Sequence, residues 1–250
     1  RAYVKCNLTE NGETKYKDVA IKLKGAAGSF RGLDDRPALT LNMDKFEKEQ
    51  TFHALDKFHL NNSVQDESFV SELIVSELCR EAGLPAPRVS HARVWLNGRD
   101  LGFYVLKEGF DEKFLSRHYA DSSGNFYDGG FVRDIDGEME KDSGKGPDDF
   151  SDVKALVAAC REEDPAKRAQ LVAERLNVDQ FLTFTALEML TCHWDGYIGN
   201  RNNYKFYFSP PDNRAVFFLH GMDQMFGDAN FPIFNVPGPM VGNAVLRNAE

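Results

Sequence analysis

The feature that most limits the possible folds of this chain is a polar, turn-rich segment between apolar runs near its C-terminal end. The run VDQFLTFTALEML ends at Leu190 and is followed by TCHWDGYIGNRNN. Two aromatic runs, YKFYF and AVFFL, come next and flank the turn residues PPDN. Apolar runs on both sides of such a turn predict a β-hairpin. A buried helix must therefore end at a polar loop that leads directly into a hairpin.

The polar loop and the end of the hairpin each carry an aspartate. His193, Asp195 and Asn200 have the spacing H-x-D-x-x-x-x-N, which is typical of the catalytic loop of protein kinases, with Trp194 in place of its arginine. The second aromatic run leads into HGMDQMFG, where Asp223 is similar to the aspartate of a metal-binding Asp-Phe-Gly element with two residues inserted. Single loop aspartates usually cap turns. The order of helix, loop, hairpin and aspartate together predicts a functional site.

Phosphoryl transfer explains why these residue types would be needed. The protein mainly positions groups and neutralises charge, and one carboxylate must lie near the acceptor hydroxyl, a role that suits Asp195. A second carboxylate and a carboxamide must hold Mg²⁺ against nucleotide phosphates, because this ion takes hard oxygen ligands. Asp223 and Asn200 suit these roles. Asn202 and Asn203 lie close to Asn200 and stay open as alternative ligands.

The first hundred residues predict an antiparallel sheet with one helix. DVAIKLKG and PALTLNM alternate apolar and polar residues, so each predicts a strand with one buried face. The loop between them, KGAAGSFRGLDDR, has neither P-loop nor G-x-G-x-x-G spacing, so a phosphate contact and an ordinary connection are both open. HARVWLNGRDLGFYVLKEGF predicts a hairpin that turns at Asn97-Gly98.

The run QDESFVSELIVSELCREAGLPAPR predicts the helix, with Asp66 as N-cap and with Gly83 and Pro85 at its end. Its expected buried stripe consists of Phe69, Val70, Leu73, Ile74 and Leu78. Glu72 and Glu77 fall largely off this stripe, so we expect two solvated glutamates. The alternative is that one of them reaches a lysine on a strand.

The middle of the chain is less informative. Asp134, Asp136 and Glu138 are spaced like calcium ligands, but the glycine and final glutamate of an EF-hand loop are misplaced, so a solvated surface loop is expected. DVKALVAACREEDPAKRAQLVAERLN predicts one or two amphipathic helices. The four cysteines lack zinc-site spacing and are expected to be buried free thiols: Cys6, Cys79, Cys160 and Cys192.

Composition argues against a general nucleic-acid surface and a membrane-spanning helix, and leaves a local basic pocket open. A net charge of −9 and a pI near 5.2 do not supply the basic surface that nucleic-acid binding needs. No apolar run is long enough for a membrane-spanning helix. Because the chain begins at Arg1 rather than Met, we expect a processed or excised fragment, which leaves room for a targeting segment before it.

Several blocks in order resemble the spore coat protein H (CotH) kinase family, an atypical, secreted or surface-associated branch of the protein-kinase-like fold. The blocks are IKLKGAAGSFR with RPALTLNMDKF, FHLNNSVQDESFVSELIVSELCREAGLPAPR, VWLNGRDLGFYVLKEGFDEKFL, HWDGYIGNRNNYKFY and HGMDQMFG. The resemblance implies an α+β, two-lobed protein-kinase-like fold. Residues 1–109 would form an N-lobe with an antiparallel sheet and one helix, and residues 110–250 a mainly helical C-lobe with a hairpin at the active site.

The resemblance also implies ATP- and Mg²⁺-dependent phosphorylation of serine or threonine in proteins. Asp195 would be the catalytic-loop aspartate and Asp223 the metal aspartate. Three basic residues then compete as phosphate ligands: Lys24, Arg31 and Arg36. Glu72 is their expected acidic partner, and the stretch from Tyr104 to Glu108 is expected to line the adenine site.

Two further functions stay open at this stage. The chain could be a kinase-shaped coat or surface protein without turnover, although such a protein need not retain Asp195, Asn200 and Asp223 together. It could also be a small-molecule kinase, which would need a closed acceptor pocket. A hydrolase is disfavoured because neither G-x-S-x-G nor H-E-x-x-H occurs. The chain stops soon after Asp223, so we expect an activation segment and further helices to be missing.

Overall fold

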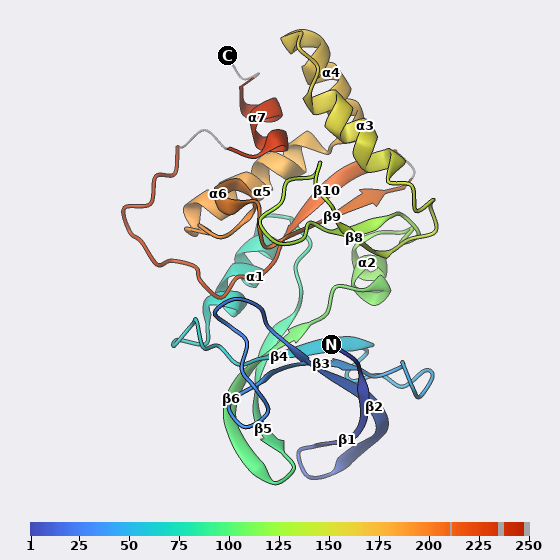
Figure 1. Cartoon of the computed structure of the whole chain (residues 1–250), viewed down its shortest axis with the longest axis vertical. Helices are drawn as coiled ribbons and strands as arrows, with labels where there is room; N and C mark the ends of the chain where they lie inside the picture. Colours follow the sequence, from blue (N-terminus) through green and yellow to red (C-terminus); the bar gives the residue numbers. More distant parts are fainter. Residues whose placement is uncertain (211, 235–237, 248–250) are drawn as a thin grey trace. The chain divides into compact units, whose positions relative to one another are not determined.

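The computed structural model in Figure 1 describes residues 1–210, 212–234 and 238–247. The fold class is α+β, as the sequence predicts. The chain divides into two compact units. Unit 1 comprises Arg1–Ser76 and Pro87–Arg117, and unit 2 comprises Glu77–Ala86 and His118–Glu250.

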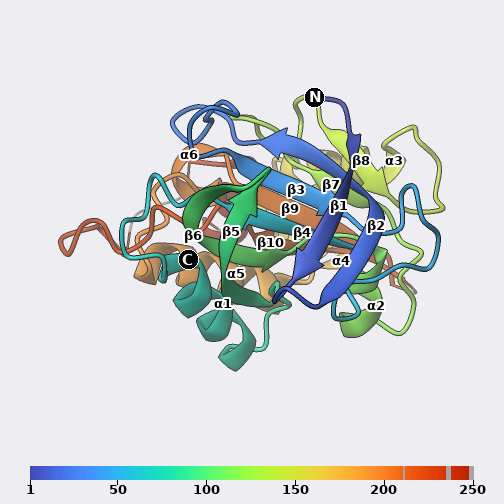
Figure 2. The ribbon, with the colours of Figure 1, turned by 90° about the horizontal axis from the view of Figure 1, so that it is seen from below.

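Unit 1 is built on one antiparallel six-stranded sheet with the order β1-β2-β3-β4-β6-β5. Its strands are β1 (Val4–Glu10), β2 (Thr14–Lys24), β3 (Ala38–Asn42), β4 (Lys57–Asn61), β5 (Val89–Leu96) and β6 (Arg99–Glu108). The sheet is strongly curled, with β1 and β2 on one side of the curl and β5 and β6 on the other (Figure 2). The predicted hairpin at Asn97-Gly98 is confirmed as β5 and β6.

The inner face of this curl holds the core of unit 1. The apolar faces of the two predicted strands meet there, since Leu23 pairs with Leu39 and Ile21 with Leu41 in register. Phe58 of β4 belongs to the same cluster and is 2% exposed. The alternation read from the sequence therefore assigned these two strands correctly, but the expectation of one buried face is wrong for β3, since Ala38 and Thr40 on its other face are each 3% exposed.

The predicted helix is α1 (Ser71–Glu81), which crosses from unit 1 into unit 2. It begins five residues after Asp66, so the prediction of Asp66 as N-cap is wrong, although the Asp66 carboxylate accepts a bond from the Ser71 amide at 3.1 Å. The expected apolar stripe is wrong, because Val70, Ile74 and Leu78 are all exposed. Position 72 lies on the buried side instead, since its carboxylate pairs with a buried lysine of β6.

Unit 2 contains a four-stranded antiparallel sheet with the order β10-β9-β7-β8. Its strands are β7 (Phe126–Asp128), β8 (Glu140–Ser143), β9 (Tyr204–Ser209) and β10 (Arg214–Leu219). The predicted aromatic hairpin is confirmed as β9 and β10. β7 and β8 are not predicted from the sequence, because β7 has three residues and β8 has no apolar residue.

The helices of the described residues after α1 are short or moderate in length. They are α2 (Glu112–His118), α3 (Ser151–Cys160), α4 (Pro165–Arg175), α5 (Val178–Leu190), α6 (Tyr197–Asn200) and α7 (Met240–Leu246). None of the helices in the described part of the chain could span a membrane. The four cysteines are free thiols, with Cys79 and Cys192 buried and Cys6 and Cys160 only half-buried.

The acidic region after β7 is only partly the solvated loop that we expect. It includes β8, and Asp134 is held by the Tyr197 hydroxyl at 2.8 Å and by the Met240 amide at 2.7 Å. Asp136 and Glu138 do lie at the surface. The expectation is therefore wrong for Asp134, which links elements far apart in the sequence.

Aromatic rings form the core of unit 2. Phe217 of β10 is fully buried and lies within about 6 Å of five other rings. These partners are Phe181, Phe184, Tyr197, Tyr204 and Phe206. Helix α5, helix α6 and the hairpin therefore share one packed cluster.

Truncation of this central ring should destabilise unit 2. We expect Phe217→Ala to lower its free energy of unfolding by about 3–5 kcal/mol, because a large buried cavity would remain. Phe131, which is 62% exposed in the same unit, is the control, and Phe131→Ala should change stability by about 0.5 kcal/mol or less. Urea denaturation followed by Trp194 fluorescence in a Trp95→Phe background measures both variants. Equal stability losses would contradict this view of the core.

Candidate active site

The candidate site begins where α5 ends. The N-cap of this helix is Asn177, whose side chain accepts a bond from the Gln180 amide. The chain reverses at Cys192, which has a φ of 56°. The His193 amide then donates to the Glu188 carbonyl at 2.7 Å. The predicted polar loop is thus folded back against the last turn of the helix.

Three asparagine side chains converge on Asp195. The Nδ2 atoms of Asn200, Asn202 and Asn203 lie 2.7, 3.0 and 2.9 Å from its carboxylate oxygens. Asn203 also donates to the Asp195 carbonyl at 3.1 Å. An ionised carboxylate accepts hydrogen bonds at both oxygens, so three N–H donors match that form. The half-buried carboxylate is therefore held in one orientation.

The segment that carries Asp223 is fastened to the same loop. The His193 Nε2 atom lies 2.9 Å from the His220 carbonyl, and the His220 amide donates to the Asn203 carbonyl at 3.0 Å. Further along, the Phe226 amide donates to the Thr191 carbonyl at 2.8 Å. Along the chain, Asp223 lies between these two attachment points, and it is half-buried.

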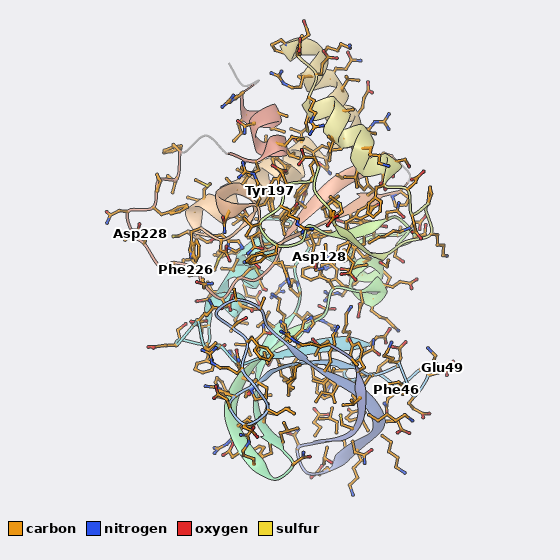
Figure 3. All side chains as sticks on the ribbon, in the orientation of Figure 1. Phe46, Glu49, Asp128, Tyr197, Phe226 and Asp228 are labelled. Carbon is orange, nitrogen blue, oxygen red and sulfur yellow. The ribbon has the colours of Figure 1, made fainter. Side chains whose placement is uncertain are left out.

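Gly221 makes the close approach of the two segments possible. Its φ is +57°, and a Cβ there would collide with the Asn203 side chain. Only glycine suits both conditions without strain. Figure 3 shows that the chain beyond this point leads outward, with Phe226 and Asp228 at the surface of unit 2.

The donor set suits a hard cation. Asp223 offers carboxylate oxygens, and the carboxamides offer neutral oxygens, both of which Mg²⁺ accepts. Asn202 is 7% exposed, whereas Asn200 and Asn203 are half-buried, so the last two are better placed as ligands. No three His, Cys, Asp or Glu residues in the described part of the chain form a ready metal cluster. Mg²⁺ commonly uses one or two carboxylates together with substrate phosphates, so the residues present fit it.

A buried carboxyl group lies directly beneath the loop. The Glu188 side chain accepts hydrogen bonds from the amides of Tyr197 at 3.0 Å and Ile198 at 2.8 Å. Burial raises its pKa to about 8, and the two N–H bonds act in the opposite direction. The Tyr197 ring lies inside unit 2 (Figure 3).

Unit 1 contains a buried ion pair that links α1 to β6. The Lys107 Nζ atom lies 2.8 Å from a Glu72 carboxylate oxygen, and these side chains are 2% and 4% exposed. The Asn61 side-chain Nδ2 atom donates to the Glu72 carboxylate at 2.7 Å, and the Lys24 Nζ atom donates to the Asn61 side-chain oxygen at 2.6 Å. Glu72 is thus not solvated, and the alternative of a contact with a strand lysine is confirmed for it. Glu77 is solvent-exposed as expected.

Lys107 is the residue that the sequence analysis missed. It was included only within the predicted stretch from Tyr104 to Glu108, and its partner lies 35 positions earlier, since 107 − 72 = 35. No local pattern identifies such a pair. The signal that could have found it is a lysine that directly follows the apolar run FYVL within a strand.

The other predicted nucleotide residues occupy different surroundings within unit 1. Arg31 donates to the carbonyls of its own loop, and Arg36 donates to the Phe103 carbonyl. Tyr104 is fully buried in the core, with its hydroxyl donating to the Pro37 carbonyl at 3.0 Å. Glu108 is also buried, and Arg117 donates to it at 2.6 Å. Their roles in nucleotide binding stay predictions.

A double-mutant cycle tests the buried ion pair. We expect Lys107→Met alone and Glu72→Met alone each to lower the free energy of unfolding of unit 1 by about 3–5 kcal/mol, because each leaves one unpaired buried charge. The double variant should be less destabilised than the sum of the two single losses. Denaturation followed by Trp95 fluorescence measures it. Additive losses would show that the two side chains do not interact.

Comparisons with known proteins find a family and distant relatives that match this chain. The family described as "CotH kinase protein" matches residues 21–244. The chain is 26% identical to the inner spore coat protein H of Bacillus subtilis over 174 residues, which are 64% of this chain and 48% of that protein. It is 25% identical to invasin CotH2 of Rhizopus delemar over 227 residues, which are 77% of this chain and 38% of the invasin. The chain therefore spans less than half the length of these curated relatives.

Proposed function

Because this chain belongs to the CotH kinase family, we propose that it is a magnesium- and ATP-dependent phosphotransferase that acts on serine or threonine of proteins. The observation that carries the proposal is the orientation of Asp195 by three carboxamides, on a loop that is fastened to the segment of Asp223. Positioned carboxylates of this kind are what phosphoryl transfer requires of a protein.

Each site residue in unit 2 has a distinct proposed role. Asp195 orients the acceptor hydroxyl and accepts its proton, and its carboxamide partners fix the direction from which it does so. Asp223 and Asn200 hold Mg²⁺, with Asn203 as the second candidate for the amide ligand. When bound, Mg²⁺ and ATP supply the phosphoryl group and neutralise its charge.

Unit 1 supports the proposal through its buried ion pair. Kinases require a strand lysine paired with a helix glutamate, and Lys107 with Glu72 is such a pair. Lys24 belongs to the same hydrogen-bonded chain through Asn61, which favours it over Arg31 and Arg36 as the phosphate ligand. We propose that the two units correspond to the N-lobe and C-lobe of a kinase-like fold.

Nucleotide binding is the decisive measurement. We expect isothermal titration calorimetry to detect ATP binding that requires Mg²⁺ and is lost in Asp223→Ala, because the metal would lose its carboxylate. Asp228→Ala is the matched control, since Asp228 is an exposed aspartate five positions further on, 228 − 223 = 5, and should leave binding unchanged. Equal binding by all three proteins would remove Asp223 from the site.

Transfer should separate from binding at Asp195. We expect Asp195→Ala to bind Mg²⁺ and ATP but to lose about 10²–10⁴-fold in transfer rate, as removal of a proton acceptor predicts. Mass spectrometry of dephosphorylated casein and of the chain itself detects the product. Absence of Mg²⁺–ATP binding in the folded wild type would favour a binding protein without turnover. Binding with transfer only to small hydroxyl compounds would favour a small-molecule kinase.

A further inference from the structure

Helix α5 presents one carboxyl group on an otherwise packed face. Phe181, Phe184, Thr185 and Glu188 follow helical spacing and are all buried. The two phenylalanines pack on Phe217 of β10, with ring centroids 5.1 and 5.6 Å from it. An apolar residue at position 188 would suit this environment better, because an ionisable group loses its hydration when buried.

The hydrogen bonds of the Glu188 carboxyl group go to backbone amides of the loop and not to another side chain. One oxygen accepts from the Tyr197 amide and the other from the Ile198 amide, at 3.0 and 2.8 Å. These two amides open α6, whose first N–H groups have no partner within the helix. Asp195 lies just before α6 and Asn200 at its end.

The fit around this carboxyl group is tight. A Cβ at Gly196 would collide with the Glu188 carboxyl and would lie within 2.8 Å of the His193 ring. The Gly196 amide donates to the His193 carbonyl at 2.9 Å, and the Asn200 amide donates to the Gly196 carbonyl at 2.9 Å. The loop therefore packs on the end of α5, and residues before and after Gly196 donate hydrogen bonds to Glu188.

From this geometry we infer that Glu188 is a positioning residue, which fixes α6 on α5 and thereby sets the place of Asp195 relative to Asn200. It touches neither of these residues by a hydrogen bond of its own and acts through the backbone of Tyr197 and Ile198. The part of this inference that concerns catalysis rests on the proposed function. The part that concerns loop order does not.

Glu188→Gln is the first test variant. It keeps the volume of the side chain but replaces one acceptor oxygen with an NH₂ group, which faces a backbone N–H donor. Thr185→Val is the matched control on the same buried face, since the Thr185 hydroxyl has no hydrogen-bond partner among the described residues. Gly196→Ala is the second variant, because it disturbs the same contact from the loop side.

Hydrogen–deuterium exchange read by mass spectrometry gives a result that does not depend on turnover. We expect peptides covering residues 195–203 to exchange at least about tenfold faster in Glu188→Gln and Gly196→Ala, while peptides of β9 and β10 stay as in the wild type. Thr185→Val should leave all of them unchanged. Unchanged exchange of 195–203 in both variants would overturn the inference, even if the wild type proves to be an active kinase.

Transfer kinetics then test the catalytic part. In an active wild type, we expect Glu188→Gln to lower kcat at least about tenfold relative to Thr185→Val, at a temperature at which both variants are folded. A kcat equal to that of Thr185→Val would overturn the positioning role. If the wild type shows no transfer, the proposed function fails on its own, and faster exchange of residues 195–203 in Glu188→Gln and Gly196→Ala still supports Glu188 as the residue that orders this loop.

Discussion

The candidate site depends on the attachment of α5 to β10. The Gln180 side chain donates to the Phe217 carbonyl at 2.5 Å and accepts from the Phe217 amide at 2.9 Å. This pair of bonds satisfies a backbone donor and acceptor that would otherwise need water, and it fixes the helix along the strand. The aromatic cluster around Phe217 then excludes solvent from the joint. The C-terminal end of α5 is thereby fixed on β10. The loop and the Asp223 segment are both attached to this end by hydrogen bonds.

Several parts of this arrangement follow from the sequence. The alternation in the first two strands, the turn at Asn97-Gly98 and the hairpin after the polar loop are local patterns, and the structure contains them. The polar segment that carries Asp195 and Asn200 was also predicted, and the structure adds a contact between their side chains. Such features are predictable because the residues that determine them lie close together along the chain.

The parts that were missed or wrong depend on residues far apart in the sequence. The ion pair of Glu72 and Lys107 forms between a helix and a strand, and it decides which side of α1 is buried. The apolar spacing of Ile74 and Leu78 therefore predicted the wrong face. Glu188 was not singled out from the sequence, because the backbone amides that it accepts from lie nine and ten positions later, 197 − 188 = 9 and 198 − 188 = 10. Local periodicity reports apolar content but not tertiary partners.

Aspartates in this structure accept hydrogen bonds in two ways, either from backbone amides at the start of a helix or from the side chains of asparagines. Asp164 is the N-cap of α4 and accepts a bond from the Lys167 amide, and Asp66 accepts from the Ser71 amide at the start of α1. Asp195 instead accepts from the side chains of three asparagines, which need not be asparagine to fold a turn. Three ordered carboxamides around one carboxylate lose side-chain freedom without shielding apolar surface. An orientation fixed in this way is what the proposed role of Asp195 in positioning an acceptor hydroxyl requires.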